Sequence, residues 1–165
     1  MRPATVALAP FALSPTHADP QTMTDTASVN LGETFSALHA FTPETVRAFS
    51  LAMGDTNPLH LDADVAARSR YGQLIASGTH TGALLMGLTA SHFSKRSPVV
   101  GVSFTIDFKR PVFATARVTL EWTVTAVRPH RGGKGQMVDL VGSLRDEADV
   151  VCVAARGTVL VGLDG

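Results

Sequence analysis

The chain has 165 residues, of which 45% are hydrophobic and 17% are charged, and it contains 14 Lys plus Arg and 14 Asp plus Glu. This composition excludes an intrinsically disordered chain and fits one globular domain, while the charge balance argues against nucleic acid or a membrane surface as a partner. The single cysteine, Cys152, excludes an internal disulfide framework and predicts a buried thiol in the reducing cytoplasm. No apolar run approaches the roughly 18 residues that a membrane span requires.

The first 30 residues differ in character from those that follow. An apolar run, Val6–Leu13, resembles the core of a signal peptide, but Pro10 interrupts it. Met23 offers a second explanation, because translation that starts there would leave the preceding residues out. In either case we expect residues 1–30 to form a poorly ordered tail and residues 31–163 to form a single domain.

A helix is predicted from Thr42 to Met53, in the stretch TPETVRAFSLAMG. Thr42 can cap the first turn, the following proline suits the first helical position, and Gly54 provides the stop. Three apolar residues recur at helical spacing, namely Val46, Phe49 and Met53. The helix therefore delivers Asp55 at its carboxyl end. A strand is expected before it, at Glu33–Ala40.

The next stretch, MGDTNPLHLD, places Asp55 and His60 five residues apart. Pro58 pushes Asn57 out of the helical region, so GDTNPLH is predicted to be a loop. Asp62 can cap a second, shorter helix through ADVAARS. Taken alone, the stretch also has a purely structural interpretation, in which Asp55 caps the loop and His60 packs beneath it.

A long apolar helix is predicted from SGTHTGALLMGLTASHF, and because most of its faces are apolar we expect it to be buried. After Pro98 the hydrophobic period changes to two, first up to Phe108 and then from Val118 to Val161. Turn-forming residues separate the later runs at RPHRGGKGQ and RDEAD. Strands joined by short turns form an antiparallel meander with one face free to wrap a helix, so the fold class is predicted as α+β.

Signatures of several common enzyme classes are missing, since there is no GxSxG, HExxH, CxxC or GxxxxGK[ST]. The six histidines do not share a helix face with a carboxylate, so no metal site is predicted. His80 has two open interpretations, because it could line a cleft or hydrogen-bond to a backbone carbonyl. The basic stretch RPHRGGKGQ could likewise contact a phosphate or remain a solvated turn.

Three stretches, GDTNPLHLD, LIASGTHTGALLMGL and SFTIDFKRPVF, resemble the MaoC-like or (R)-specific enoyl-CoA hydratase family. The resemblance implies a hot-dog fold, in which an antiparallel sheet wraps one long helix, and a homodimer. It also implies an acyl thioester of coenzyme A or of an acyl carrier protein as substrate, with no cofactor. By this resemblance Asp55 and His60 are the catalytic pair, and Gly78 and Thr79 hold the thioester oxygen.

The sequence departs from the family pattern at two positions. Many members carry a histidine immediately before the glycine that corresponds to Gly78, where this chain has Ser77. In the best-known bacterial hydratases a serine further along the helix shapes the acyl pocket, and Met86 stands in its place. Together with Asn57 and His80, these two residues complete the expected substrate-binding set.

The residue types suit the hydration of a 2-enoyl-CoA to an (R)-3-hydroxyacyl-CoA, or the reverse reaction. Addition of water needs a base at the water and an acid at the α-carbon, and Asp55 and His60 can divide that work. Free N–H groups at a helix N-terminus can stabilise the enolate oxygen, and Gly78 lets a ligand approach them closely. The leading hypothesis is therefore an enoyl-CoA hydratase or 3-hydroxyacyl dehydratase.

Two other functions remain open at this point. A hot-dog thioesterase usually needs an Asp or Glu on or near the central helix, and Gly78–Phe93 contains neither. A non-catalytic acyl-CoA-binding subunit would keep the fold, but the presence of both Asp55 and His60 argues against it. The acyl length, the carrier and the direction of reaction do not follow from these residues.

Overall fold

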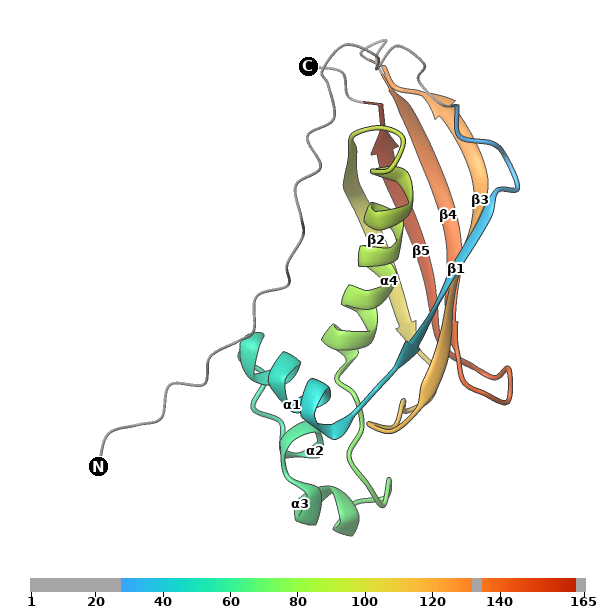
Figure 1. Ribbon diagram of the computed structural model, residues 1–165. Helices are drawn as coiled ribbons and strands as arrows, with labels where there is room; N and C mark the ends of the chain where they lie inside the picture. The colour runs from blue at the N-terminus through green and yellow to red at the C-terminus, as the bar shows by residue number, and fades with distance from the viewer. Residues whose placement is uncertain (1–27, 132–134, 163–165) are drawn as a thin grey trace.

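A long helix lies against one face of a curved antiparallel sheet, and shorter helices gather where it begins (Figure 1). The computed structural model describes residues 28–131 and 135–162. In chain order the elements are β1 (Thr34–Ala40), α1 (Pro43–Ala52), α2 (Pro58–Leu61), α3 (Ala63–Arg68), α4 (Gly78–Phe93), β2 (Val99–Phe108), β3 (Arg117–Pro129), β4 (Gln136–Arg145) and β5 (Val151–Val161). The predicted α+β hot-dog fold, a sheet around a central helix, is confirmed.

The sheet has five strands in the order β1-β3-β4-β5-β2, and every neighbouring pair is antiparallel. β3, β4 and β5 follow one another along the chain, so the predicted meander is confirmed. The turn at RDEAD is tight and holds Asp149 at a φ of 60°. The turn at RPHRGGKGQ includes residues 132–134, which lie outside the described residues. β1 and β2 form the two edges of the sheet.

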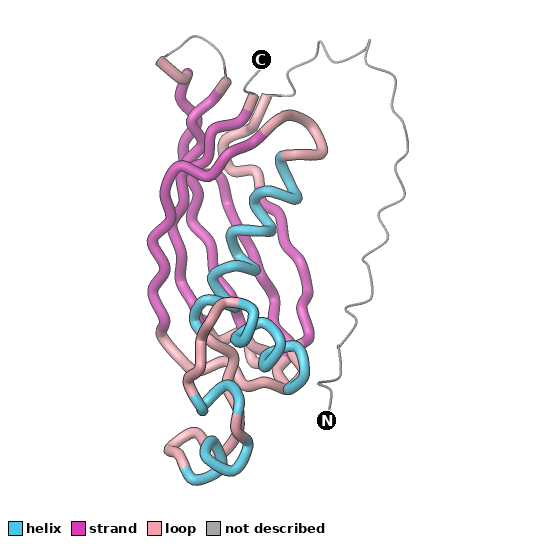
Figure 2. The backbone as a smooth tube through the Cα atoms, turned by 90° about the vertical axis from the view of Figure 1, so that its left-hand side faces the viewer, coloured by secondary structure: helices cyan, strands magenta, loops and turns pink. Residues whose placement is uncertain are grey.

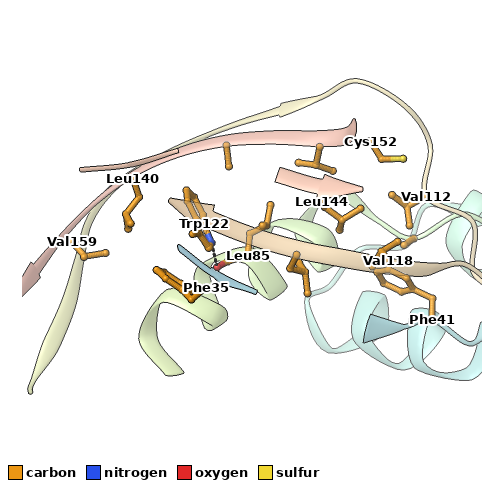
Figure 3. Close-up of a cluster of buried hydrophobic side chains, with 14 of the residues drawn as sticks. Phe35, Phe41, Leu85, Val112, Val118, Trp122, Leu140, Leu144, Cys152 and Val159 are labelled. Atoms are coloured by element: carbon orange, nitrogen blue, oxygen red, sulfur yellow. Dashed lines mark hydrogen bonds between the residues drawn. The ribbon is translucent and has the colours of Figure 1, made fainter. Parts of the chain in front are cut away.

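Trp122 anchors α4 to the sheet. Its indole Nε1–H donates to the carbonyl of Leu85 at 2.9 Å, and both side chains are fully buried (Figure 3). Gly82 allows β2 to approach the helix closely, since a Cβ there would lie 2.9 Å from Ile106 Cδ1. Burying a large apolar side chain stabilises a fold by about 1.5–3 kcal/mol. This packing therefore sets the rotation of α4 about its own axis.

α4 is buried on one face only, which corrects the expectation that most of its faces would be covered. Leu85 and Phe93 face the sheet and are fully buried, whereas Met86 is 39% exposed. The neighbouring Gly87 and Ala90 are also exposed. A single sheet can cover only one face of the helix, so the opposite face stays exposed.

The chain enters the fold earlier than expected. Val29, which we placed in the tail, is 5% exposed, and its N–H donates to the side-chain oxygen of Gln136 at 3.1 Å. Residues 1–27 of the expected tail lie outside the described residues. Cys152 is buried in β5, as predicted. None of the helices that the structure describes is long and apolar enough to cross a membrane.

The shorter helices close the end of the fold at which α4 begins (Figure 2). α1 starts as predicted, because the Thr42 hydroxyl accepts from the N–H of Thr45 and the Thr45 hydroxyl accepts from the N–H of Thr42. Gly54 follows the helix with a φ of 72°, a left-handed conformation that glycine adopts without strain. α1 contacts α4, so the chain after Gly54 is held beside the start of the long helix.

Candidate active site

His60 lies on a short helix and not on the loop that we expected. α2 forms because Pro58 suits the first helical position and the side-chain oxygen of Asn57 accepts from the N–H of Leu59 at 3.1 Å. Asp62 follows and caps α3, as predicted. A one-turn helix capped at both ends gives His60 a defined backbone position.

The turn after α1 orients Asp55. Its N–H donates to the carbonyl of Ser50 at 2.8 Å, and its Oδ1 accepts from the N–H of Asn57 at 3.0 Å. This Asx-turn occupies one carboxylate oxygen with the backbone and leaves Oδ2 beside His60. The Asp55 side chain is 27% exposed, so solvent reaches it.

A backbone carbonyl sets the tautomer of His60. Nδ1 lies 2.8 Å from the carbonyl oxygen of Ile75, and because that oxygen can only accept, Nδ1 carries the proton. In the neutral ring Nε2 then has a free lone pair, 3.7 Å from Oδ2 of Asp55. The fold therefore brings together the two side chains that the sequence singled out.

Two hydrogen-bond acceptors face each other across this gap of 3.7 Å. A carboxylate oxygen and an imidazole lone pair cannot bond to each other without a proton between them. A water molecule can donate one hydrogen bond to Asp55 and a second one to His60. The arrangement is therefore suited to hold and polarise one water, which is the task of a general acid–base pair.

A cavity of about 440 Å³ opens beside His60. Its walls come from α2, the connection between α3 and α4, the first turn of α4, the end of β2 with the chain that follows it, and β5. The lining residues are His60, Arg70, Tyr71, Ile75, Ala76, Gly78, Thr81, Phe108, Lys109, Arg110, Pro111, Val112 and Val153. Asp55 does not line the cavity, but it lies next to His60, which does.

The first turn of α4 offers free backbone donors. Ser77 caps the helix, with its Oγ accepting from the N–H of His80 at 3.2 Å and its carbonyl accepting from the N–H of Thr81. The N–H groups of Gly78 and Thr79 have no hydrogen-bond partner among the residues that the structure describes. Together with the positive end of the helix dipole, these two groups can bind a negatively charged oxygen.

Gly78 lies beside the ring of Phe108. A Cβ at this position would lie 2.8 Å from Phe108 Cζ, so a side chain would have to displace the ring. Both residues line the cavity, and Phe108 is 59% exposed. A ligand that moves this exposed ring would meet the helix N-terminus directly. Thr79 does not line the cavity, although it lies in the same first turn of α4.

Four residues expected to bind substrate do not line this cavity. Asn57 and Ser77 use their side chains to cap α2 and α4. His80 and Met86 lie on other faces of α4, because at about 100° per residue they are turned by about 160° and 80° away from Gly78. The first of the two interpretations of His80 is confirmed, because His80 lines a cleft. This cleft is separate from the cavity beside His60.

Three cations of the cavity wall went unrecognised in the sequence. Arg70, Lys109 and Arg110 line the cavity, and no Asp or Glu that the structure describes does so. Arg70 donates to the phenolic oxygen of Tyr71 at 2.6 Å. Lys109 lies 3.6 Å from Asp107, but both side chains are half exposed, so the pairing is weak. The sequence feature that could have indicated two of these cations is the basic pair in FKRPVF.

A separate charged cluster lies at the other end of α4. Glu33 contacts His92 and Arg96, and although burial opposes ionisation, the hydrogen bonds from these two partners lower the pKa of Glu33 to about 2. The cluster ties the start of β1 to the end of α4. In the part of the chain that the structure describes, no group of three His, Cys, Asp or Glu residues could hold a metal ion.

The chain is similar to proteins of known sequence. A family model described as MaoC like domain matches residues 11–143. An (R)-specific enoyl-CoA hydratase from Aeromonas caviae is 35% identical over 102 residues, which cover 61% of this chain and 75% of the relative. A protein from Streptomyces griseus subsp. griseus, named only as a UPF0336 protein, is 29% identical over 120 residues, or 68% of this chain and 77% of that protein.

A solved structure has the same fold. It is described as the (R)-hydratase from A. caviae involved in PHA biosynthesis, and it matches with a TM-score of 0.73 and 27% sequence identity. The match covers 81% of this chain and 97% of that one. The likeness therefore extends over the whole sheet-and-helix unit and is not limited to the GDTNPLHLD stretch.

Proposed function

This chain belongs to the MaoC-like domain family, and we propose that it interconverts a 2-enoyl thioester and an (R)-3-hydroxyacyl thioester by adding or removing water. The observation that carries the proposal is the placement of Asp55 and His60. Their Oδ2 and Nε2 atoms lie 3.7 Å apart, beside a cavity that also contains the start of α4. Relatives named as an enoyl-CoA hydratase and a 3-hydroxybutyryl-CoA dehydratase support this reaction class.

In the hydration direction, one water lies between Asp55 and His60 and donates a hydrogen bond to each. As its oxygen bonds to the β-carbon, one of the two residues takes a proton from it, and the pair delivers that proton to the α-carbon. The substrate has then gained the H and OH of one water, and both residues return to their starting state. Because they share one water, the two residues act as a unit.

Negative charge develops on the thioester oxygen during this step. The N–H groups of Gly78 and Thr79 are the donors that we propose to stabilise it, and donors of this kind accelerate such reactions by about a hundredfold or more each. Gly78 and His60 line the same cavity, so one bound thioester can reach both. The helix N-terminus thus stabilises charge on the thioester oxygen, while the acid–base pair handles the water and the proton at the β- and α-carbons.

The cations of the cavity suit the carrier of the acyl group. Coenzyme A and the phosphopantetheine arm of an acyl carrier protein both carry phosphate, which guanidinium groups bind with two parallel hydrogen bonds. Arg70 and Arg110 supply such groups and Lys109 adds a third positive charge. Apolar wall residues, including Ile75 and Val112, suit the acyl chain.

We also propose that the protein is a homodimer. β2 is an edge strand, and Val100, Val102 and Phe108 on it are 47%, 53% and 59% exposed. An exposed apolar edge is a template for pairing with another strand, and a second copy related by a two-fold axis offers the same edge. Phe108 also lines the cavity, so the proposed interface lies next to the proposed site.

A thioesterase mechanism has less support. It would need a carboxylate on or near the central helix, and α4 has no Asp or Glu. Glu33 lies near α4 but is held by His92 and Arg96 at the end of the helix opposite the cavity. The acid–base pair beside a helix N-terminus favours hydration.

The test is an assay with trans-2-enoyl-CoAs of increasing chain length. Hydration removes the double bond that is conjugated to the thioester, so the absorbance of this chromophore falls. We expect it to fall with at least one substrate, and chiral analysis should identify the product as the (R)-isomer. A folded protein that leaves every enoyl-CoA and enoyl-acyl carrier protein unchanged would refute the proposal. Release of free thiol without hydration would instead indicate a thioesterase.

A further inference from the structure

A second cavity, of about 630 Å³, lies between α4 and β1 and shares no lining residue with the cavity at His60. One of its walls is a face of α4 on which His80, Leu84 and Leu88 follow each other at intervals of four residues. The facing wall is formed by β1 and includes His39. The cavity is therefore an apolar groove with two histidines where the long helix begins.

Two buried ring nitrogens of this wall lack partners. Nδ1 of His80 and Nε2 of His39 make no hydrogen bond with any residue that the structure describes. His80 is 5% exposed, and the centres of the two rings lie 6.0 Å apart. Leaving a buried polar atom unsatisfied is unfavourable, so native structures rarely do it without a reason. Both atoms are closed to solvent in this arrangement, so one small polar group between the rings can satisfy them only if the rings move slightly apart.

The rings restrict the chemistry of that group. Burial, with a contribution from His39, lowers the pKa of His80 to about 4, and burial also lowers the pKa of His39. Each ring is therefore neutral near pH 7 and has one N–H donor and one lone pair. A hydroxyl can accept from one ring and donate to the other. A carboxylate can only accept, and it would bring a charge next to Phe41 and Phe49.

We propose that this groove is a second ligand site, which binds an aliphatic chain that carries a hydroxyl group. The hydroxyl lies between His39 and His80, and the chain follows Leu84 and Leu88 along α4. The helix from His80 to Leu88 spans about 12 Å, which matches a chain of roughly eight carbons. The site is independent of the proposed hydratase function, because it uses none of the residues of the first cavity.

Gly87 provides a way to fill the groove without disturbing the fold. It lines the groove, and a Cβ added to it would meet no atom within 4 Å. Gly87→Phe therefore adds a ring to the wall of the groove at a position where its Cβ meets no other atom, and replacing a glycine inside a helix favours the helical state. Gly87→Ala is the matched control, because its methyl group leaves most of the groove empty.

Isothermal titration calorimetry of the full chain with 1-octanol, 2-octanone and octanoate tests the proposal. We expect 1-octanol to bind, and 2-octanone to bind about tenfold more weakly because it loses one of two hydrogen bonds. Octanoate should bind more weakly than 1-octanol. Gly87→Phe should abolish binding and Gly87→Ala should retain it. His80→Phe should remove the difference between the alcohol and the ketone while it keeps the ring stacked on Phe49.

The same measurements can overturn the proposal. If 1-octanol does not bind at the highest concentration that dissolves, the proposal is wrong. This holds whether the chain's own N-terminal residues or a second copy of the chain fills the groove. Equal binding by Gly87→Phe would place the ligand elsewhere. Preference for octanoate would show an anion site at Lys95, which lines the groove further along, and not a hydroxyl site at the histidines. Melting temperatures of the variants verify that each one is folded.

Discussion

His80 stacks on Phe49, with ring centroids 4.1 Å apart and an angle of 4° between the planes. The contact joins the first turn of α4 to α1, and Asp55 follows closely after α1. A buried imidazole therefore helps to hold the helix that positions one half of the proposed acid–base pair. Because a buried ring is most stable in its neutral form, this contact makes the fold sensitive to acid.

Stability is expected to fall as the pH is lowered from about 6.5 to about 4. Burial, with a smaller effect of His39, lowers the pKa of His80 from 6.5 to about 4. Within this interval the unfolded chain binds a proton that the folded chain does not. The free energy of unfolding should therefore decrease by on the order of 3 kcal/mol across the interval and be insensitive to this residue at higher pH. Urea unfolding at several pH values measures the effect.

His80→Phe is the control for this prediction. The variant can keep the stack on Phe49 and has no imidazole to protonate. Its free energy of unfolding should depend less on pH between about 4 and 6.5, and the dependence that remains reports His39 and the carboxylates. Identical pH profiles for the variant and the unmodified protein would show that His80 does not control acid stability.

Replacing the proposed acid–base pair should lower turnover and leave the fold intact. Asp55→Asn keeps an oxygen that can accept from the N–H of Asn57, and His60→Asn can still donate to the carbonyl of Ile75. We expect each variant to reduce hydration by about 10²–10⁴-fold. The double variant should be little worse than the poorer single variant, because the two residues act on one water.

The purely structural interpretation of the same pair predicts the reverse. If Asp55 only closes a turn and His60 only packs, the variants should lose stability and their activity should follow the folded fraction. Melting temperature and kcat/KM measured on the same preparations separate the two cases. Full activity in a folded Asp55→Asn protein would exclude this site.

Gly78→Val should damage turnover more than folding. The new side chain can push the exposed ring of Phe108 aside, but it blocks the approach of the thioester to the N–H groups of α4. We expect kcat/KM to fall by about a hundredfold, the effect of losing one such donor. Gly87→Val is the matched control on the same helix, because a Cβ there meets no atom within 4 Å and lies outside the first cavity. Similar kinetics for both variants would remove Gly78 from the mechanism.

Arg110→Gln should weaken substrate binding and have little effect on the chemical step. Removing a cation that binds phosphate should raise KM for an enoyl-CoA by about tenfold at low salt and leave kcat nearly unchanged. The difference should shrink at high salt, where exposed charges are screened. Arg156→Gln is the control, because Arg156 is exposed on β5 and does not line the cavity. An unchanged KM for Arg110→Gln would show that the carrier binds elsewhere.

Val102→Lys should convert the proposed homodimer into monomers. Val102 is 53% exposed on the edge strand β2, where a lysine in each copy would place two like charges at the interface. Val141→Lys is the control, because Val141 is 49% exposed but lies on the central strand β4. Light scattering at micromolar concentration reports the mass. A monomeric unmodified protein would contradict the dimer, and a dimeric Val102→Lys protein would contradict this interface.

Short-range patterns in the sequence predicted most of the elements correctly. Thr42 caps α1 and Gly54 follows its end because both effects depend on residues within a few positions. The predicted loop at GDTNPLH is confirmed for residues 54–57, but its last three residues belong to a one-turn helix that Asn57 caps and Pro58 starts. A turn and a helix of one turn use the same residue types, so local preferences do not distinguish them.

The walls of the cavity could not be predicted from local patterns. Arg70 and Arg110 are 40 positions apart in the sequence, yet they line the same cavity. His80 and Met86 were expected at the substrate, but they lie on other faces of α4. The direction of these side chains depends on how the helix is rotated against the sheet, and the hydrogen bond from Trp122 to Leu85 helps to set that rotation.

By itself the sequence determined the fold class, and by resemblance it indicated the family and the candidates Asp55, His60 and Gly78. Only the tertiary structure shows that the side chains of Asp55 and His60 lie 3.7 Å apart and that Gly78 lines a cavity with three cations. It also shows that a second groove lies along α4. The physical reason is that capping and alternation act between near neighbours in the chain. Cavities arise where distant segments pack, and only the packed chain shows which side chains meet there.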